Sequence, residues 1–128
     1  MLKILLASLI LMTTTIPAHA KWTKADTASK PGEIHYFDLE TVQKNDTYRK
    51  VWTLSSYDEP QSGGHQSIKT LYQFDCSGSK ARAVTILLYP DKTAETTVIG
   101  AHHDENRDWF DYSPQSVFSG IAKAVCND

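Results

Sequence analysis

The segment QSIKTLYQFDCSGSKARAVTILLY, residues 66–89, decides the fold because it contains two predicted strands joined by a tight turn. Side chains alternate between the two faces of a strand. On the first strand, predicted over residues 66–75, one face carries Ile68, Thr70, Tyr72, Phe74 and, just past its end, Cys76. Ser77-Gly78-Ser79 turns the chain into the second strand, Lys80–Tyr89, which is apolar on both faces from residue 84 onward. Such a strand is expected at the centre of a sheet.

Further short runs of aromatic and β-branched residues, separated by turn-forming residues, predict an antiparallel sheet of about six strands in total. These runs cover residues 22–25, 33–38, 48–57, 95–101 and 109–112. Between them we expect a polar link over residues 26–32, a helical turn over residues 39–42 capped by Asp38, and a turn at Lys44-Asn45-Asp46. Residues 102–108 are expected to form a charged loop.

The segment Val117–Val125 is predicted to be an amphipathic helix, because its apolar side chains fall within an arc of about 120°. These side chains are Val117, Phe118, Ile121, Ala124 and Val125. Ser116 is the preferred N-cap, with Ser113 capping a helix that begins at Pro114 as the alternative. Since so short a helix is marginal alone, we expect the sheet to cover its apolar arc.

Residues 1–20 predict a secretory signal peptide. Lys3 gives a basic start, residues 4–12 are an apolar run, and Ala18-His19-Ala20 puts small residues where signal peptidase reads the chain. The run is far shorter than the roughly 20 residues needed to span a bilayer. We therefore expect cleavage between Ala20 and Lys21. With no cysteine near the cut, the product is expected to be exported without a lipid anchor and to be periplasmic, released or at the cell surface.

The mature chain, residues 21–128, has the size of a single domain. Because the signal contains one Lys and no acidic residue, the domain has 12 Lys and Arg against 15 Asp and Glu, a net charge of −3. The basic residues are scattered along the sequence, which argues against nucleic acid as a partner. The sequence also lacks a basic amphipathic helix that would bind a membrane surface after export.

Cys76 and Cys126 are the two cysteines of the chain, and an even pair in an exported protein is expected to be oxidised. We predict one disulfide between them. A free reactive thiol or a metal-binding pair is the alternative, but the pair lacks the close spacing and neighbouring ligands of a zinc site. The bridge would hold the helix over the face formed by Ile68, Tyr72 and Phe74. The predicted fold is therefore α+β, with a single antiparallel sheet and a C-terminal helix packed on one face.

Two clusters contain residue types that catalysis or metal binding could use. His102-His103-Asp104-Glu105 holds potential metal ligands, but adjacent loop residues seldom share one coordination sphere. Ser62-Gly63-Gly64-His65 places a hydroxyl and an imidazole on one loop, without a nucleophile elbow or a matched acid, and is interpreted as a flexible connection between strands. Asp104, Glu105, Asp108 and Asp111 are interpreted as a hydrated acidic edge. We therefore predict no catalytic residue, no metal site and no cofactor.

The large aromatic residues have two interpretations. They are Tyr48, Trp52, Tyr57, Tyr72 and Tyr89. Tyr and Trp anchor protein interfaces, but they also fill cores, and we expect most of these five to lie between the sheet and the helix. If the other face of the sheet is uncovered, apolar residues such as Leu71 would have to meet a bound ligand or a second copy in a homodimer.

Several residues occur in an order that resembles a known family. They are Trp22, Tyr36-Phe37-Asp38, Val51-Trp52, Ser67-Ile68-Lys69-Thr70-Leu71, Phe74-Asp75-Cys76, Trp109, Pro114-Gln115-Ser116 and Val125-Cys126. In these features the chain resembles the surface-adhesin protein E family of Gram-negative bacteria. The resemblance implies the same fold and a noncatalytic binding function. The founding adhesin is associated with attachment to epithelial cells and with capture of vitronectin, laminin and plasminogen, which implies a host or extracellular-matrix protein as partner.

The sequence departs from a surface-displayed adhesin in lacking a lipid-attachment cysteine, the simplest anchor for such a protein. Two functions therefore follow as hypotheses. The first is an adhesin E-like protein that binds a protein or peptide through a sheet face and the adjacent loops. The second is a periplasmic inhibitor or protective protein, for example against lysozyme-type enzymes, a task that suits small disulfide-bonded β domains.

Overall fold

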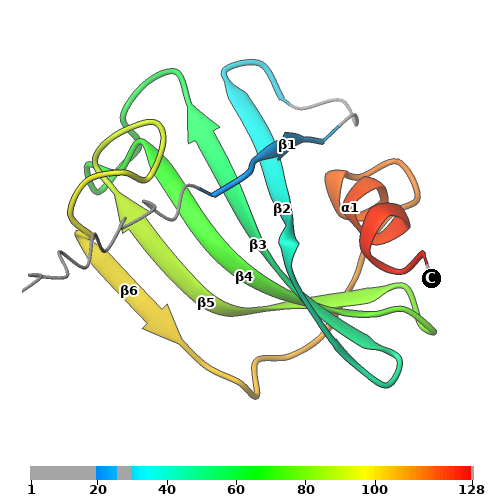
Figure 1. The fold of residues 1–128 in the computed structure, drawn as a ribbon. Coiled ribbons are helices and arrows are strands. Elements are labelled where there is room, and N and C mark those ends of the chain that lie inside the picture. Colours follow the sequence, from blue (N-terminus) through cyan, green and yellow to red (C-terminus); the bar gives the residue numbers. More distant parts are fainter. Residues whose placement is uncertain (1–19, 26–29, 128) are drawn as a thin grey trace, which may run out of the picture.

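The computed structural model describes residues 20–25 and 30–127 of the chain. The predicted signal peptide lies outside these residues except for Ala20, and so does most of the predicted polar link. In the described ranges seven strands form one antiparallel sheet, followed by a helix (Figure 1). The elements are β1 (Thr23–Lys24), β2 (Glu33–Asn45), β3 (Tyr48–Tyr57), β4 (Ser67–Asp75), β5 (Lys80–Tyr89), β6 (Gly100–His103), β7 (Phe110–Asp111) and α1 (Val117–Val125). The predicted α+β class is confirmed.

The sheet is ordered β1-β2-β3-β4-β5-β6, and β7 pairs with β5 on the same edge as β6. The bounds of β3, β5 and α1 are those predicted, and β4 begins one residue later than predicted. Cross-strand partners share a face. Val51 pairs with Tyr72, and Phe74 with Ala81, which places these residues on the face that α1 covers. We call this the helix face.

The opposite face of the sheet is called the open face. On it Trp52 pairs with Leu71, and Lys50 pairs with Gln73, which pairs in turn with Arg82. Leu71 is half-buried there. The one helix of the described residues packs on the other side of the sheet, near β1 and β2 in Figure 1.

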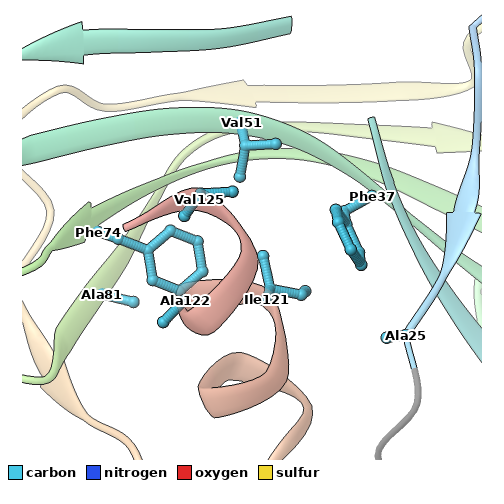
Figure 2. Packing of buried hydrophobic residues seen from close by; sticks show 8 residues of the cluster. All are labelled: Ala25, Phe37, Val51, Phe74, Ala81, Ile121, Ala122 and Val125. Atoms are coloured by element: carbon cyan, nitrogen blue, oxygen red, sulfur yellow. The ribbon is translucent and has the colours of Figure 1, made fainter. Parts of the chain in front are cut away.

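The core lies between α1 and the helix face, as Figure 2 shows. Phe74 and Val51 are both 0% exposed, and they pack with Ile121 and Val125 of α1. Partly buried Val117, Phe118 and Ala124 complete the predicted apolar arc, and Ala122 joins them in the core. Ile68, predicted to lie under the helix, is not in this cluster. A helix of this length is only about 13 Å long, so it covers only part of β4, the end next to Cys76.

Both ends of α1 are capped, and the N-cap is the residue that the sequence predicts. The Ser116 side chain accepts a hydrogen bond from the Ser119 amide at 3.4 Å, which satisfies one of the free N–H groups of the first turn. Cys126 is the C-cap and donates its amide to the Ala122 carbonyl at 2.8 Å. Of the two alternatives for the helix start, Ser116 is therefore the N-cap.

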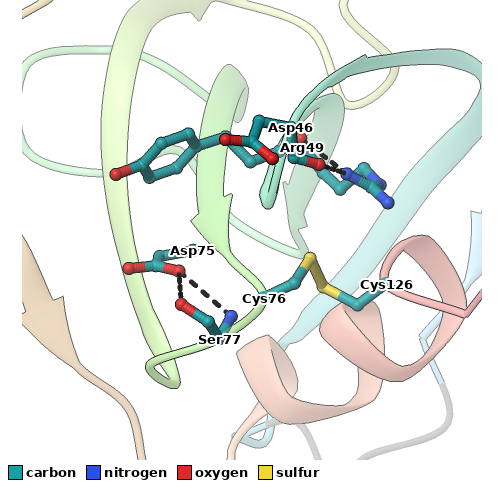
Figure 3. Close-up of a disulfide and its surroundings, with 7 residues drawn as sticks. Asp46, Arg49, Asp75, Cys76, Ser77 and Cys126 are labelled. Atoms are coloured by element: carbon teal, nitrogen blue, oxygen red, sulfur yellow. Dashed lines mark hydrogen bonds between the residues drawn. A yellow bond between two sulfur atoms is a disulfide. The ribbon is translucent and has the colours of Figure 1, made fainter.

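The predicted disulfide is confirmed. Cys76 and Cys126 are bonded, with their Cα atoms 5.6 Å apart (Figure 3). Next to the bridge, the Asp75 carboxylate accepts hydrogen bonds from the amide and the hydroxyl of Ser77, at 3.0 and 2.7 Å, and holds the turn after β4. The bridge therefore joins the end of α1 to a fixed hairpin.

The helical turn predicted after Asp38 is wrong, because β2 continues as a strand to Asn45. Its register with β3 shifts between Asp38 and Gln43. The Thr41 hydroxyl spans this irregularity: it donates to the Asp38 carbonyl at 2.7 Å and accepts from the Trp52 amide at 3.1 Å. This cross-strand bond keeps the extra residues in the sheet as a bulge. The turn itself lies at Asp46 and Thr47 and overlaps the predicted turn only at Asp46, which has a φ of 58°.

The strand predicted over residues 95–101 is also wrong in its position, because β6 covers only Gly100–His103. The Asp91 carboxylate explains the difference. It accepts hydrogen bonds from the amides of Glu95 at 2.9 Å and Thr93 at 3.3 Å, and from the Thr96 hydroxyl. Amides that donate to Asp91 cannot also donate the main-chain hydrogen bonds of a strand paired with β5. The first half of the predicted strand is therefore a loop organised around one side chain.

This loop gives a pH-dependent prediction. Burial alone would raise the pKa of Asp91, but hydrogen bonds from the Thr96 hydroxyl and from the amides of Glu95 and Thr93 outweigh it and lower the pKa to about 2. Since the ordinary value is 3.8, the stabilisation is fully present above that pH and is lost as the pH falls through about 2. We expect Asp91→Asn to speed hydrogen exchange of the Glu95 amide about tenfold at pH 6, measured by NMR. Unchanged exchange in the variant would contradict the role given to this carboxylate.

Candidate functional site

The open face carries two clusters in which a cationic side chain lies against aromatic rings. In the first, called the Trp22 cluster, the Lys69 ammonium lies 6.0 Å from the ring centroid of Trp22 and 5.1 Å from that of Trp52. Trp22 directly precedes β1, Trp52 lies in β3 and Lys69 in β4. The two rings present their electron-rich faces to the ammonium, which orients all three side chains.

A pocket of about 310 Å³ opens beside the Trp22 cluster. It is lined by Ala20, Trp22, Asp38, Glu40, Thr41, Trp52 and Lys69. The irregular part of β2 supplies the polar wall, since the bulge turns consecutive residues toward the pocket. The pocket thus combines indole rings, an ammonium group and carboxylates.

Asp38 is the most buried polar residue of this pocket, at 3% exposed. Its Oδ1 accepts from the Glu40 amide at 3.0 Å, and its Oδ2 accepts from the main-chain nitrogen of Lys21 at 3.2 Å. The Lys21 side chain turns outward and pairs with Glu40 at 2.9 Å. Glu40, as hydrogen-bond acceptor and as a negative charge, raises the pKa of Lys21. Because that pair is exposed, it adds little stability.

The second cluster, called the Trp109 cluster, contains Tyr48, Arg82 and Trp109. The Tyr48 and Trp109 rings stack with centroids 5.8 Å apart, and the Arg82 guanidinium carbon lies 4.2 Å from the Trp109 centroid. Arg82 also donates from Nε to Gln73 Oε1 at 2.9 Å. Arg82 Nη1 donates to the Arg107 carbonyl at 3.4 Å, so two hydrogen bonds hold the guanidinium at the Trp109 ring.

The loop between β6 and β7 positions Trp109. The amide of Asp104 donates to the Val84 carbonyl at 2.9 Å, and Arg107 Nε donates to the Ala83 carbonyl at 2.8 Å. Both acceptors lie at the register shift in β5. The loop is therefore hydrogen-bonded to β5 between the residues that pair with β6 and those that pair with β7.

The structure separates the two side chains of the histidine pair singled out in the sequence. His102 and His103 lie on β6, where His102 pairs with Ile86 and His103 with Thr85, so the two rings project to opposite faces of the sheet. His103 Nδ1 is 2.7 Å from the Thr85 hydroxyl, and its Nε2 is 3.7 Å from Glu105 Oε1. Across residues 20–25 and 30–127, no three His, Cys, Asp or Glu side chains are grouped so that they could hold a metal ion.

The segment Ser62-Gly63-Gly64-His65 is part of the connection between β3 and β4, as predicted. Two main-chain hydrogen bonds hold it, from the Gln61 amide to the His65 carbonyl at 2.7 Å and from the Gly64 amide to the Gln61 carbonyl at 2.9 Å. Gly63 and Gly64 adopt φ values of 100° and 89°, which favour glycine. The His65 ring meets the Tyr57 ring edge-on at 6.3 Å. The hydrogen bonds and glycine conformations of this segment therefore stabilise a turn between β3 and β4.

The acidic residues Asp104, Glu105, Asp108 and Asp111 are all exposed, as the hydrated-edge interpretation predicts. Asp104 Oδ1 accepts from the Asn106 amide at 2.9 Å, and Asp111 pairs with Lys80 at 3.0 Å on the surface. These contacts order the loop and its edge.

The expectation that most large aromatic residues fill the core under the helix is wrong. Tyr72 does so, with its ring 5.2 Å from Phe118. Tyr48 and Trp52 project from the open face, because they alternate with the buried Val51 along β3. Tyr89 is 8% exposed and pairs with Ser67, on the open face as well. The aromatic surface of the domain is thus divided between its two faces.

Sequence reasoning missed both clusters as sites. Alternation along β4 places Lys69 with Leu71 on the face opposite Phe74. This alternation is a signal that the helix does not cover Lys69. The sequence does not bring Trp22 to Lys69, or Trp109 to Arg82, because these contacts depend on which strands are neighbours.

A model of the family described as Surface-adhesin protein E matches residues 22–127 of the chain. No curated protein and no solved structure matches it. The matched region runs from the Trp22 cluster to the end of α1 and includes both cysteines. In the described part of the chain, no helix combines the length and apolar character needed to cross a membrane.

Proposed function

The chain belongs to the surface-adhesin protein E family, and we propose that it is an exported, noncatalytic protein that binds another protein or a peptide through its open face. The family supports a binding role rather than an enzymatic one. The observation that carries the choice of surface is the presence of two aromatic–cation clusters on the same face of the sheet.

The composition of this face suits protein recognition. Trp, Tyr and Arg are the residue types that most often dominate binding energy at interfaces. Here three tryptophans and Tyr48, which is 36% exposed, gather on one side of the sheet, away from the core. Their positions are fixed by cation contacts and by the tied loop, so little side-chain freedom is lost when a partner binds.

The chemistry of the clusters indicates the kind of partner. Lys69 and Arg82 present positive charge beside aromatic surface, and Lys50 lies on the same face, across Gln73 from Arg82. A partner segment with acidic side chains next to apolar or aromatic ones would complement both properties. We propose host and extracellular-matrix proteins with such exposed segments as the class of partner.

Export is part of the proposal. The Cys76–Cys126 bond requires an oxidising compartment, which supports secretion across the inner membrane. We propose cleavage of the signal peptide between Ala20 and Lys21, followed by residence in the periplasm or at the cell surface without a lipid anchor. N-terminal sequencing of the processed protein tests the cleavage position. Antibody labelling of intact cells, compared with cells whose outer membrane is opened, tests the location.

Binding is tested with purified residues 21–128 on immobilised vitronectin, laminin and plasminogen. We expect micromolar or tighter binding to at least one of them, and we expect Trp52→Ala to weaken it about 30-fold, the effect of losing an interface anchor. Lys123→Ala changes an exposed side chain of α1, on the opposite side of the sheet, and is the control, expected to bind as the wild type does.

The variants also test which surface is used. If Trp52→Ala and Arg82→Ala both fold, as judged by their melting curves, and both bind like the wild type, the open face is not the binding surface. If none of the three proteins binds at micromolar concentration, the matrix-binding proposal is wrong.

A further inference from the structure

We infer that signal cleavage creates a charged contact that the precursor lacks, between the new α-ammonium group of Lys21 and the buried carboxylate of Asp38. The inference rests on the proposed cleavage between Ala20 and Lys21. It makes processing a step that completes the folded domain and the Trp22 cluster, in addition to releasing the protein from the membrane.

The geometry places the relevant atoms in contact. The main-chain nitrogen of Lys21 lies 3.2 Å from Oδ2 of Asp38, and the carboxylate is 3% exposed. The other oxygen, Oδ1, already accepts from the Glu40 amide at 3.0 Å. The nitrogen that meets Asp38 is thus the atom that a cut after Ala20 would free.

The change in chemistry follows from hydrolysis of one peptide bond. Before cleavage the Lys21 nitrogen is an amide with a single N–H and no charge. Water breaks the C–N bond, Ala20 leaves with a carboxylate, and the Lys21 nitrogen becomes an ammonium group with three donors at neutral pH. A hydrogen bond from a neutral amide to a buried carboxylate is thereby replaced by one from an ammonium group, so that donor and acceptor carry opposite charges and the contact becomes an ion pair.

The added positive charge affects the stability of the folded domain because Asp38 is buried. A buried carboxylate is unfavourable unless it is paired and hydrogen-bonded. The Lys21 side chain extends to Glu40 at 2.9 Å, with 74% of that side chain exposed, and the Lys69 ammonium lies between two indole rings. The α-ammonium would put a full positive charge directly on the buried carboxylate.

The same contact would fix one wall of the pocket. The segment that carries Trp22 is held to β2 through a strand of only two residues, β1, and through the Ala25 amide, which donates to the His35 carbonyl at 2.9 Å. An ion pair at Lys21 anchors the other end of this segment, on the far side of Trp22. Cleavage also removes Ala20, which lines the pocket, and so widens the space beside the indole rings.

The test compares two N-termini on otherwise identical protein. One form begins at Lys21, released from a fusion by a protease that leaves no extra residue, and the other begins at Pro17, so that the Lys21 nitrogen stays an amide. We expect the equilibrium constant for unfolding in urea to be about tenfold smaller for the form that begins at Lys21. In an Asp38→Asn background, the difference between the two forms should fall below about twofold, because the charge partner is gone. Glu40→Gln, which affects only the side-chain pair of Lys21, should leave the tenfold difference intact.

Two outcomes would overturn the inference: equal stability of the two forms, or a difference that survives Asp38→Asn. A second readout serves if Asp38→Asn does not fold. The α-amine of the form beginning at Lys21 should react with an acylating reagent at pH 7 at least about tenfold more slowly in the native state than in urea, because the ion pair withholds it. Equal rates would contradict the contact. N-terminal sequencing of protein from cells tests the cleavage position separately, and a cut at another position would count against the export proposal. The comparison of the two defined N-termini tests the contact between Lys21 and Asp38 itself.

Discussion

Phe74→Ala is expected to lower the free energy of unfolding by about 3–5 kcal/mol, measured by urea denaturation. Phe74 is 0% exposed and lies at the centre of the core, with its ring 6.1 Å from that of Tyr112 and 6.3 Å from that of Tyr72. Truncation removes the apolar surface of the ring and leaves a cavity between β4 and α1. Tyr72 lies on β4 itself and Tyr112 directly follows β7, so the two rings are held by different segments and cannot both move in to fill it.

The matched control is Phe110→Ala. Phe110 is 37% exposed, although its ring contacts Phe118 at a centroid distance of 5.0 Å. Its truncation should cost about 1 kcal/mol, because part of its surface is already in water and solvent can fill the space. A loss below about 1.5 kcal/mol for Phe74→Ala would mean that the helix does not depend on this residue, and that the core differs from the one described.

The regular part of the fold can be predicted from the sequence because it depends on local patterns. Alternation along β3 and β4 identifies the face that carries Val51 and Phe74, and the helical arc from Val117 identifies the complementary surface. The start of α1 also follows from the sequence, because the Ser116 side chain can accept a hydrogen bond from the first turn. Pro114 disfavours helical backbone at Ser113. In each case the signal lies within about one turn or one strand.

The errors have a common physical origin in short polar side chains that bind the main chain. Asp38 does accept the Glu40 amide, which is the bond expected of a cap, but the same bond is compatible with an extended bulge. What decides between the two is the contact of Thr41 with the Trp52 amide on the neighbouring strand. Asp91 likewise removes the amides of Glu95 and Thr96 from the ladder predicted for residues 95–101.

The candidate site could be predicted only in part for a related reason. Composition shows that Trp and Tyr are available, and alternation along β4 shows that Lys69 lies away from Phe74. The two clusters exist because β1 pairs with the edge of β2 and because the loop before β7 is tied to β5 at Val84. Such contacts between distant segments leave no pattern within either segment.

Cys126→Ser is expected to lower the free energy of unfolding by about 2–5 kcal/mol, with Cys76→Ser giving the same loss. The bridge closes a loop between residues 50 apart in the sequence, so breaking it mainly restores freedom to the unfolded chain. The native contacts should loosen first in α1, because a nine-residue helix is marginal without tertiary support and Cys126 is its C-cap. Hydrogen exchange should therefore accelerate at Val125 and Cys126 before it does in β3 and β4.

The bridge and the core stabilise the helix by different means, and the variants separate them. With the bridge broken, Ile121 and Val125 still bury apolar surface against Phe74, so the domain should remain folded at low temperature and lose its helix protection selectively. The double variant Cys76→Ser, Cys126→Ser should be no less stable than either single variant, because the two residues act through one bond. Wild-type protein treated with a reductant should match it. Losses that add in the double variant would show that the two cysteines do not act through one bond, and unchanged exchange in α1 would show that the helix is held without the bridge. The sheet would then be stabilising α1 through the packing around Phe74 alone.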